Sequence, residues 1–280
     1  MDFLAVLPVV PSKVYVIRLI RKRRSRSPAG VPDASIKYRP SDYCPMKASV
    51  WPLERTRPVF EAIEYSRGLR DRLVLQAEIP ELGSYSRWAN QFTRELLPYY
   101  DEYVSTVSSR VMSISLQLSV FILTMCTIFA PKSVVDLGSG FSSVVLRLYQ
   151  RSSGNRIRVC SVDDSADWLS KTERFLVAHD LPADRLFHWE EFKHENSAFD
   201  LVLHDLGDSS LRRESLSKVL SLAHSHSFIV LDDANVRGYN LYVRNLLDEE
   251  LYRSYCLRSF TIDFFKRYSM LISPKNDHSS

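Results

Sequence analysis

The feature that most constrains the fold is a strand that runs into a glycine-bearing loop and then a helix. Residues 133–143 read SVVDLGSGFSS, with a pair of valines near the start and two glycines in the middle. Adjacent valines favour a buried strand. Gly138 and Gly140 let the backbone turn sharply and approach a ligand closely, and the following helix presents unpaired N–H groups at its amino end. The segment therefore predicts a strand–loop–helix unit that binds a ligand.

Strand-like and helix-like segments alternate from residue 132 onward. The predicted strands are Ser133–Leu137, Arg156–Val162, Arg185–Trp189, Asp200–His204 and Ser227–Leu231. The predicted helices are Ser143–Gln150, Ala166–His179, Leu211–Ala223 and Tyr239–Glu250. This alternation predicts a Rossmann-like α/β fold, a doubly wound and mostly parallel sheet with helices on both faces. Two final strands, Tyr255–Phe260 and Tyr268–Ile272, have no helix between them and predict an antiparallel edge strand.

Two segments of different composition precede the alternating region. Residues 1–55 are rich in proline, serine and basic residues, which predicts a partly flexible N-terminal segment. Residues 56–130 predict a helical N-terminal extension that serves as a lid or substrate-recognition segment, and residues 131–280 form the predicted catalytic domain. In the extension, Val107–Phe129 predicts one long helix, although the alternation over Ser113–Val120 also fits a strand.

Aromatic side chains of this extension are candidates for lining a substrate site. Helices are also predicted over Val59–Leu69 and Tyr85–Tyr103. The second of these helices carries Trp88, Tyr99, Tyr100 and Tyr103. Ordinary core packing is the alternative interpretation for each of these rings.

Positive charge is distributed unevenly along the chain, whose formal net charge is +4. The stretch Arg18–Arg26 is dense in arginine and predicts a weak contact with phosphate or an anionic membrane, with a solvated arm as the alternative. The alternating region lacks the interleaved basic and aromatic residues typical of RNA binding, so the sequence carries no strong signal for a nucleic-acid partner and favours a small-molecule acceptor.

The four cysteines form no CxxC motif and no Cys/His cluster, which favours a reducing, cytoplasmic location. Positive charge follows the first apolar residues instead of preceding them, unlike the arrangement in a secretory signal. The strongly apolar stretch Val120–Ala130 is too short to span a bilayer and is expected in the core.

Aspartates stand at the ends of three predicted strands. Asp136 ends the first strand, Asp163 and Asp164 the second, and Asp205 the fourth. Because ligands of open α/β sheets bind outside the carboxyl ends of the strands, these acids should converge on one crevice. Asp136 would repel a pyrophosphate and would suit a cationic ligand, such as a sulfonium that bears an amino group. Asp163 is placed to accept hydrogen bonds from ribose hydroxyls, while Asp164 or Ser165 would cap the next helix.

The segment Asp136–Ser142 resembles motif I of the class I S-adenosylmethionine-dependent methyltransferases, an acid followed by GxG at the end of the first strand. Ser142 stands where the family often has a third glycine, and Asp205 resembles the acid of motif IV. The resemblance extends over about residues 107–272 and implies binding of S-adenosylmethionine. The implied cofactor-binding residues are Asp136, Gly138, Ser139, Gly140, Ser142, Asp163, Asp164, Glu190 and Asp205; Glu190 follows the third strand, where the family commonly contacts adenine.

Three acids near the fourth and fifth strands bear on catalysis. Asp205 with Asp232 and Asp233 resembles the acid set of the catechol-type O-methyltransferases, which implies a Mg²⁺ ion that binds the acceptor hydroxyls. In the metal-free alternative, Asp232 and Asp233 orient the substrate or cap the next helix. His204, Asp205 and Asp208 are the candidate general bases, and Asp208 stands where that group has a lysine. Strand alternation would turn His204 away from the crevice that holds Asp205.

The sequence thus predicts an S-adenosylmethionine-dependent methyltransferase that O-methylates a small molecule or a sugar hydroxyl. One alternative is a non-catalytic S-adenosylmethionine-binding or scaffolding protein with the same fold. Another is a protein or nucleic-acid methyltransferase that docks through its basic N-terminal arm. A nicotinamide-dependent oxidoreductase is a third, and the position of Asp136 and the missing GxGxxG count against it.

Overall fold

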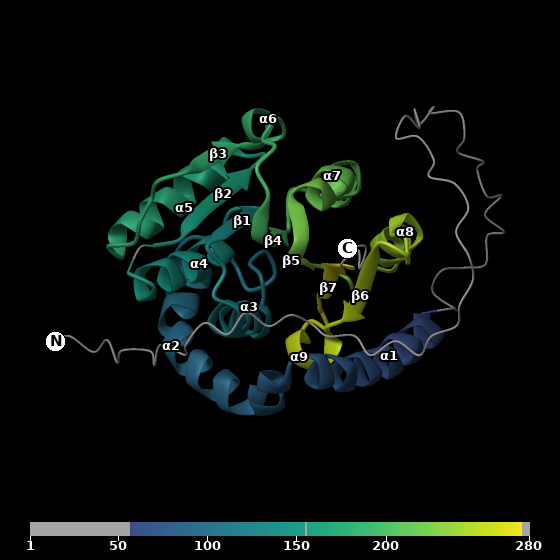
Figure 1. The fold of residues 1–280 in the computed structure, drawn as a ribbon. Coiled ribbons are helices and arrows are strands. Elements are labelled where there is room, and N and C mark those ends of the chain that lie inside the picture. Colours follow the sequence, from purple (N-terminus) through teal and green to yellow (C-terminus); the bar gives the residue numbers. More distant parts are fainter. Residues whose placement is uncertain (1–56, 155, 276–280) are drawn as a thin grey trace.

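The computed structural model describes residues 57–154 and 156–275, which form one sheet with helices on both faces (Figure 1). The strands are β1 (Ser133–Leu137), β2 (Arg158–Asp163), β3 (Leu186–His188), β4 (Phe199–His204), β5 (Ala223–Leu231), β6 (Tyr252–Cys256) and β7 (Met270–Pro274). Their order in the sheet is β3-β2-β1-β4-β5-β7-β6. Strands β1 to β5 are parallel, and β7 pairs antiparallel with both β5 and β6.

This order is that of a Rossmann sheet, 3-2-1-4-5-6, with one antiparallel strand inserted between the fifth and sixth strands. The inserted strand is β7, which follows β6 in the chain without a long crossover helix. The predicted Rossmann-like sheet, mostly parallel and with an antiparallel pair at its edge, is confirmed.

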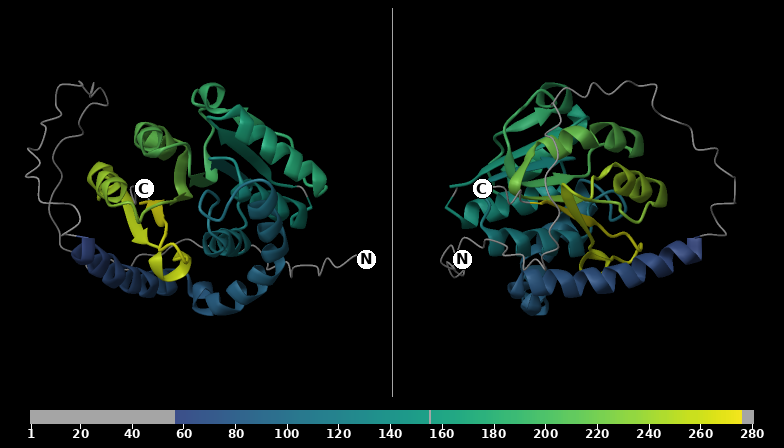
Figure 2. Two further views of the ribbon diagram at one scale, coloured as in Figure 1. Left: turned by 180° about the vertical axis from the view of Figure 1, so that it is seen from behind. Right: turned by 45° about the vertical axis from the view of Figure 1, so that its right-hand side comes forward.

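Helices cover both faces of the sheet. They are α1 (Arg57–Glu78), α2 (Tyr85–Thr106), α3 (Leu116–Phe129), α4 (Phe141–Ser152), α5 (Ala166–Ala178), α6 (Trp189–Phe192), α7 (Ser209–Ser221), α8 (Arg237–Leu246), α9 (Arg258–Thr261) and the 3-10 helix η2 (Pro80–Ser84). One apolar core joins α2, α3, α4 and α5 to one face, and a second joins α6, α7 and α8 to the other. Figure 2 shows that α1 and α2 follow one another along one side of the molecule.

The N-terminal extension is part of the main core. Leu75 of α1, Phe92 of α2 and Phe121 of α3 are buried in the same cluster as Val134 of β1. Its role as a lid stays a prediction. Residues 1–55, which are predicted to be partly flexible, and the basic stretch Arg18–Arg26 lie outside the described residues. Among the residues described, none of the helices has the length and apolar character needed to cross a membrane.

The predicted helix over Val107–Phe129 begins later than expected, because residues 107–115 form a loop between α2 and α3. A strand over Ser113–Val120 does not form. Instead Ser115 caps α3, and its Oγ accepts a hydrogen bond from the amide of Leu118 at 3.0 Å. A serine at this position is favoured because it satisfies an amide that has no partner within the helix.

The loop is held by a side chain from the far end of the chain. The guanidinium of Arg267 donates hydrogen bonds to the carbonyls of Arg110, Val111 and Ser113 at 2.7–3.0 Å. These bonds satisfy carbonyls that a helix would otherwise pair internally. The loop therefore depends on a long-range contact that local periodicity does not encode.

The strand predicted over Tyr255–Phe260 instead begins and ends earlier, as β6 (Tyr252–Cys256). Strand β6 ends at Cys256, whose amide donates to Oδ2 of Asp71 in α1 at 2.8 Å. The next residues form α9, in which Arg258 pairs with Glu61 of α1 at 3.0 Å. Packing against α1 thus takes the backbone and side-chain partners that a longer strand would need.

Candidate functional site

A cleft of about 440 Å³ opens at the carboxyl ends of β1, β2 and β4. Its walls are the loop Gly138–Ser142, the segment Asp163–Ser165 with Trp168, the residues Asp205, Gly207, Asp208 and Arg212, and Tyr103 with part of the loop 107–115. The volume is within the range of small-molecule sites. The structure therefore brings the carboxyl ends of β1, β2 and β4 to one place, and Asp163 and Asp205 line the cleft; Asp136, which was expected there as well, is fully buried and is not among the lining residues.

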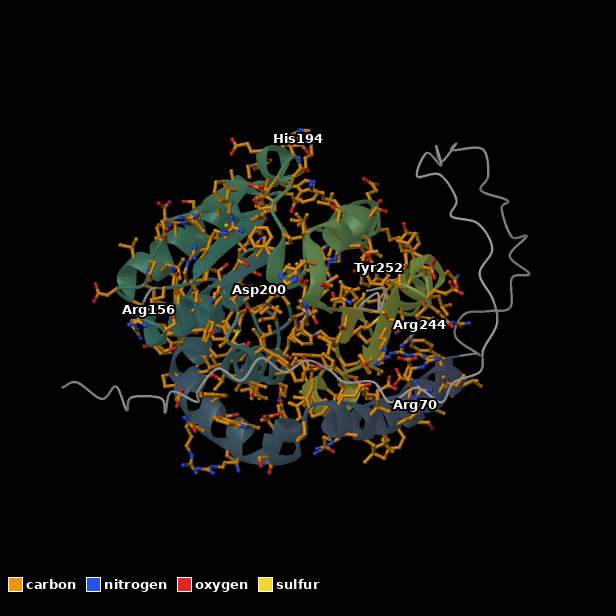
Figure 3. All side chains as sticks on the ribbon, viewed as in Figure 1. Arg70, Arg156, His194, Asp200, Arg244 and Tyr252 are labelled. Carbon is orange, nitrogen blue, oxygen red and sulfur yellow. The ribbon has the colours of Figure 1, made fainter. Side chains whose placement is uncertain are left out.

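The opposite end of β4 shows that an acid in this sheet can be purely structural. Asp200 lies at the amino end of that strand (Figure 3), where its Oδ2 accepts hydrogen bonds from the amides of Lys132 and Ser133 at 2.7 and 2.8 Å. Its Oδ1 is 2.9 Å from Nε2 of His224. These partners are protein groups of neighbouring strands and loops, so Asp200 stabilises that end of the sheet.

Gly138 is the point of closest approach between the β1 and β4 loops. Its φ is +110°, and a Cβ built there would lie 2.4 Å from the carbonyl oxygen of Asp205. No side chain fits at that distance, so only glycine is compatible with this loop. The second glycine, Gly140, precedes the first residue of α4, and its amide is 3.4 Å from Oγ of Ser143. The glycines thus have the two roles that the sequence assigned to them, a tight turn and a helix start.

Asp136 lies fully buried beneath this loop. Its Oδ2 accepts hydrogen bonds from the hydroxyls of Ser142 at 3.0 Å and Ser143 at 2.6 Å. Its Oδ1 has no partner among the described residues. Burial raises the pKa of Asp136 to about 7, although the two serine hydrogen bonds oppose the shift. Ser142 therefore donates a hydrogen bond to the Asp136 carboxylate. A third glycine at this position would have no hydroxyl and could not make this bond.

Asp163 joins the end of β2 to the glycine loop. Its Oδ2 accepts hydrogen bonds from the amide and the hydroxyl of Ser139 at 2.7 and 2.9 Å, and its Oδ1 accepts from the amide of Ser165 at 2.9 Å. Ser165 caps α5, as one reading of the sequence predicted. Asp164 lines the cleft beside Gly207, where a built Cβ would lie 3.2 Å from both of its carboxylate oxygens.

Two aromatic side chains complete this half of the cleft. Tyr103, at the end of α2, is almost fully buried, and its hydroxyl has no hydrogen-bond partner among the described residues. Of the four aromatic candidates in the extension, it is the one that lines the cleft. Trp168, in the first turn of α5, was not predicted. Its position soon after Asp163 in the strand–helix connection was the available signal.

Asp205 and Asp233 are bridged by an arginine that the sequence reading missed. Nη2 of Arg212 is 2.5 Å from Oδ1 of Asp205, and Nη1 is 2.6 Å from Oδ2 of Asp233. The Arg212 side chain is 13% exposed and lines the cleft. The third acid, Asp232, instead accepts a hydrogen bond from the hydroxyl of Ser269 at 2.9 Å, and burial raises its pKa to about 6.

The Mg²⁺ site predicted at Asp205, Asp232 and Asp233 does not fit this arrangement. No group of three or more candidate ligands that could hold a metal ion occurs in the described part of the chain. In addition, the guanidinium of Arg212 pairs with one oxygen each of Asp205 and Asp233, and Asp232 is bonded to Ser269 instead of facing them.

His204 is not placed to act as a base in the cleft. It is fully buried against α7 and α8, with Nδ1 3.2 Å from the hydroxyl of Tyr239 and Nε2 3.0 Å from Oγ of Ser215. Burial and the nearby Arg212 lower the pKa of His204 to about 3. His204 is not among the residues that line the cleft, and its burial, not strand alternation, separates it from the cleft: Asp205 contacts the same helix α7 through Arg212.

Two other predicted residues differ from their expected surroundings. Asp208 lines the cleft, but its Oδ1 caps α7 by accepting hydrogen bonds from the amides of Ser210 and Leu211 at 2.8 and 3.0 Å. These bonds lower the pKa of Asp208, so the group is a poor proton acceptor. Glu190 is not among the residues that line the cleft, and it pairs with Lys193 in a mostly exposed position.

No family model and no curated protein matches the chain. Among solved structures, the cofactor-bound protein Rv0187 from MTB is similar with a TM-score of 0.50 and 15% identity, over 75% of this chain and 98% of that one. The O-methyltransferase TomG from Streptomyces achromogenes, in complex with SAM, has a TM-score of 0.47 and 15% identity, over 76% and 99%. The O-methyltransferase from Bacillus cereus, in complex with SAH, has a TM-score of 0.47 and 13% identity, over 76% and 100%. The chain thus shares its fold with Rv0187, and this similarity concerns the fold alone.

Proposed function

We propose that the cleft binds S-adenosylmethionine and that the protein transfers its methyl group to a hydroxyl of a small molecule or sugar. The observation that carries this proposal is the electrostatics of the cleft. Its lining includes Asp163, Asp164, Asp205 and Asp208, and Arg212 is the one basic side chain among its lining residues. A cleft with this excess of acids favours a cation over a nucleotide pyrophosphate.

Unsatisfied groups near β1 support the choice of this cofactor. Buried polar atoms are normally hydrogen-bonded, so the unpartnered Oδ1 of Asp136 and hydroxyl of Tyr103 suggest a missing ligand. The loop Gly138–Ser142 would accommodate the aminoacyl end of the molecule, and Asp163 with Asp164 its ribose. Trp168 offers an aromatic face for the base. Bound there, S-adenosylmethionine would supply an electrophilic methyl group on its sulfonium.

Asp205 is the residue that we assign to the acceptor. It ends β4 beside the glycine loop, and its side chain is 17% exposed. Burial raises its pKa, while Arg212 opposes that shift. In this position the carboxylate would accept a hydrogen bond from the acceptor hydroxyl and orient its oxygen. Positioning of this kind contributes much of the rate in a bimolecular substitution.

Calorimetry with S-adenosylmethionine and S-adenosylhomocysteine tests the proposal. The full chain should bind both, and Asp163→Asn should bind them weakly because it loses the charge that holds Ser139. Glu95→Gln, an exposed acid on α2, is the matched control and should bind as the unaltered protein does. Transfer of a radiolabelled methyl group to a panel of hydroxyl compounds then measures activity. Absence of cofactor binding would overturn the proposal, and binding without transfer to any acceptor would favour the scaffolding alternative.

A further inference from the structure

The inference concerns Arg212 and rests on the proposed function. Arg212 lies in the first turns of α7, which begins directly after Asp208. From there its guanidinium reaches across the end of β4 to Asp205 and the end of β5 to Asp233. Its Nη2 also lies 3.5 Å from the carbonyl oxygen of Asp205. One side chain thus joins the ends of two neighbouring strands at the wall of the cleft.

This position is the one in which a divalent cation was expected. A cation there would neutralise Asp205 and Asp233 and hold their carboxylates at the edge of the sheet. The guanidinium satisfies the same two carboxylates with a fixed, planar set of donors, and it does not lose its proton in a protein. Both of its terminal nitrogens face a carboxylate at 2.5–2.6 Å, which is the geometry of strong, charge-assisted hydrogen bonds.

We propose that Arg212 is the resident cation of the acceptor site, so that the protein works without a divalent metal and binds its acceptor through a single hydroxyl. A metal ion can offer two open coordination positions to neighbouring hydroxyls and thereby select a chelating diol. A guanidinium whose two terminal nitrogens are taken by carboxylates offers no such pair of positions. Arg212 is a positioning residue that acts through Asp205.

Removal of the arginine should convert the site into a metal site. In Arg212→Ala the carboxylates of Asp205 and Asp233 lose their shared cation. Two facing carboxylates together with water provide the oxygen ligands that Mg²⁺ and Mn²⁺ prefer. Arg212→Lys keeps one positive charge at this place and should still exclude the ion. Arg213→Ala is the matched control, because Arg213 is exposed on the same helix and does not line the cleft.

The experiment titrates the purified full chain with Mn²⁺ and follows free Mn²⁺ by electron paramagnetic resonance and the melting temperature by calorimetry. The unaltered protein, Arg212→Lys and Arg213→Ala should bind no stoichiometric Mn²⁺ at millimolar concentration and should melt at the same temperature with Mn²⁺ or EDTA. Arg212→Ala should melt lower in EDTA, bind one Mn²⁺ and regain part of its melting temperature. Asp233→Asn added to Arg212→Ala should abolish that binding.

Two results would overturn the proposal. One is a stoichiometric Mn²⁺ site in the unaltered protein that Asp233→Asn removes, and the other is a folded Arg212→Ala variant that does not respond to Mn²⁺. If Arg212→Ala does not fold, the unaltered protein still tests the proposal. An effect of EDTA on its methyl transfer or on its affinity for S-adenosylmethionine would contradict the proposal that Arg212 is the resident cation. Calorimetry with S-adenosylmethionine on the same samples tests the proposed function independently. If the protein does not bind the cofactor, the proposed function fails, but the Mn²⁺ results on Arg212 are unchanged.

Discussion

The acids at the two ends of the cleft differ in whether a cation of the protein pairs with them. Around the ends of β1 and β2, Asp136 keeps one carboxylate oxygen without a partner, and the hydroxyl of Tyr103 is unpaired as well. Around the ends of β4 and β5, Asp205 and Asp233 are bridged by Arg212. The first half has serine hydroxyls and amides as donors but no cation among the residues that line the cleft. The second half contains its own cation.

This difference indicates which half is completed by a ligand. A buried carboxylate without a counter-charge is costly, so the β1–β2 half gains most from a cationic molecule that enters it. The β4–β5 half already contains a cation between two of its carboxylates, so a neutral, hydrogen-bonding partner suffices there. A cationic methyl donor in the first half and a hydroxyl acceptor in the second are the assignment that follows from the charges.

The largest effect is expected where the two halves meet. Gly138→Ala places a Cβ at 2.4 Å from the carbonyl oxygen of Asp205, at a φ of +110° that alanine rarely adopts. We expect a loss of about 4 kcal/mol in the free energy of unfolding, from strain and overpacking together. Affinity for S-adenosylmethionine should fall below detection. Urea unfolding and calorimetry measure the two effects.

Gly83→Ala is the control for that substitution. A Cβ built on Gly83 meets no atom within 4 Å, and its φ lies outside the range that excludes side chains. This variant should unfold and bind the cofactor as the unaltered protein does. Equal behaviour of the two variants would show that the β1 and β4 loops are not in contact as described.

Asp163→Ala should separate the two halves. It removes the acceptor of two hydrogen bonds from Ser139 and thereby releases the glycine loop. Hydrogen bonds to charged groups contribute about 1.5–3 kcal/mol each, so the affinity for S-adenosylmethionine should fall about 100-fold. Arg212→Lys should change that affinity by no more than about twofold, since it keeps the positive charge and shares no contact with the residues of the cofactor half. An equal loss in both variants, measured by calorimetry, would contradict the division into a cofactor half and an acceptor half.

The charge of Asp136 predicts a smaller, pH-dependent effect. Its pKa in the folded protein is about 7, so the carboxylate ionises as the pH rises through neutrality. The affinity for cationic S-adenosylmethionine should therefore rise about tenfold between about pH 6 and about pH 8, since one pKa unit corresponds to about 1.4 kcal/mol.

The stability of the free protein should change in the opposite sense. Because the folded-state pKa is above the ordinary value of an aspartate, the folded state holds the extra proton below neutrality, and stability is lost as the pH rises through about 7. Asp136→Asn should remove both pH dependences. Affinity that stays constant with pH in the unaltered protein would show that Asp136 does not act on the ligand.

Part of this site could be read from the sequence because strand ends are set by local patterns. The valine-rich strand and the glycines are neighbours in sequence, each acid lies at the end of its own strand, and parallel pairing brings such ends together. Arg212 was missed because the sequence alone does not show whether an arginine on a polar helix face points to solvent or to another part of the protein. That depends on how the helix packs against the sheet. Arg267, which holds residues 107–115, has its partners more than 150 positions away. Contacts of that range have no local signature.

The smallest effect on the cofactor is expected from His204, which faces neither half. Its ring bridges Tyr239 and Ser215 behind β4. Because its pKa is about 3, below the ordinary value of histidine, its contribution to stability is present above about pH 6.5 and is lost as the pH falls toward 3. His204→Gln should lower the free energy of unfolding at neutral pH by about 1–3 kcal/mol, through the buried hydroxyls that it leaves less well paired. Its affinity for S-adenosylmethionine and the pH profile of methyl transfer should match those of the unaltered protein, and a displaced pH profile would return His204 to the list of candidate bases.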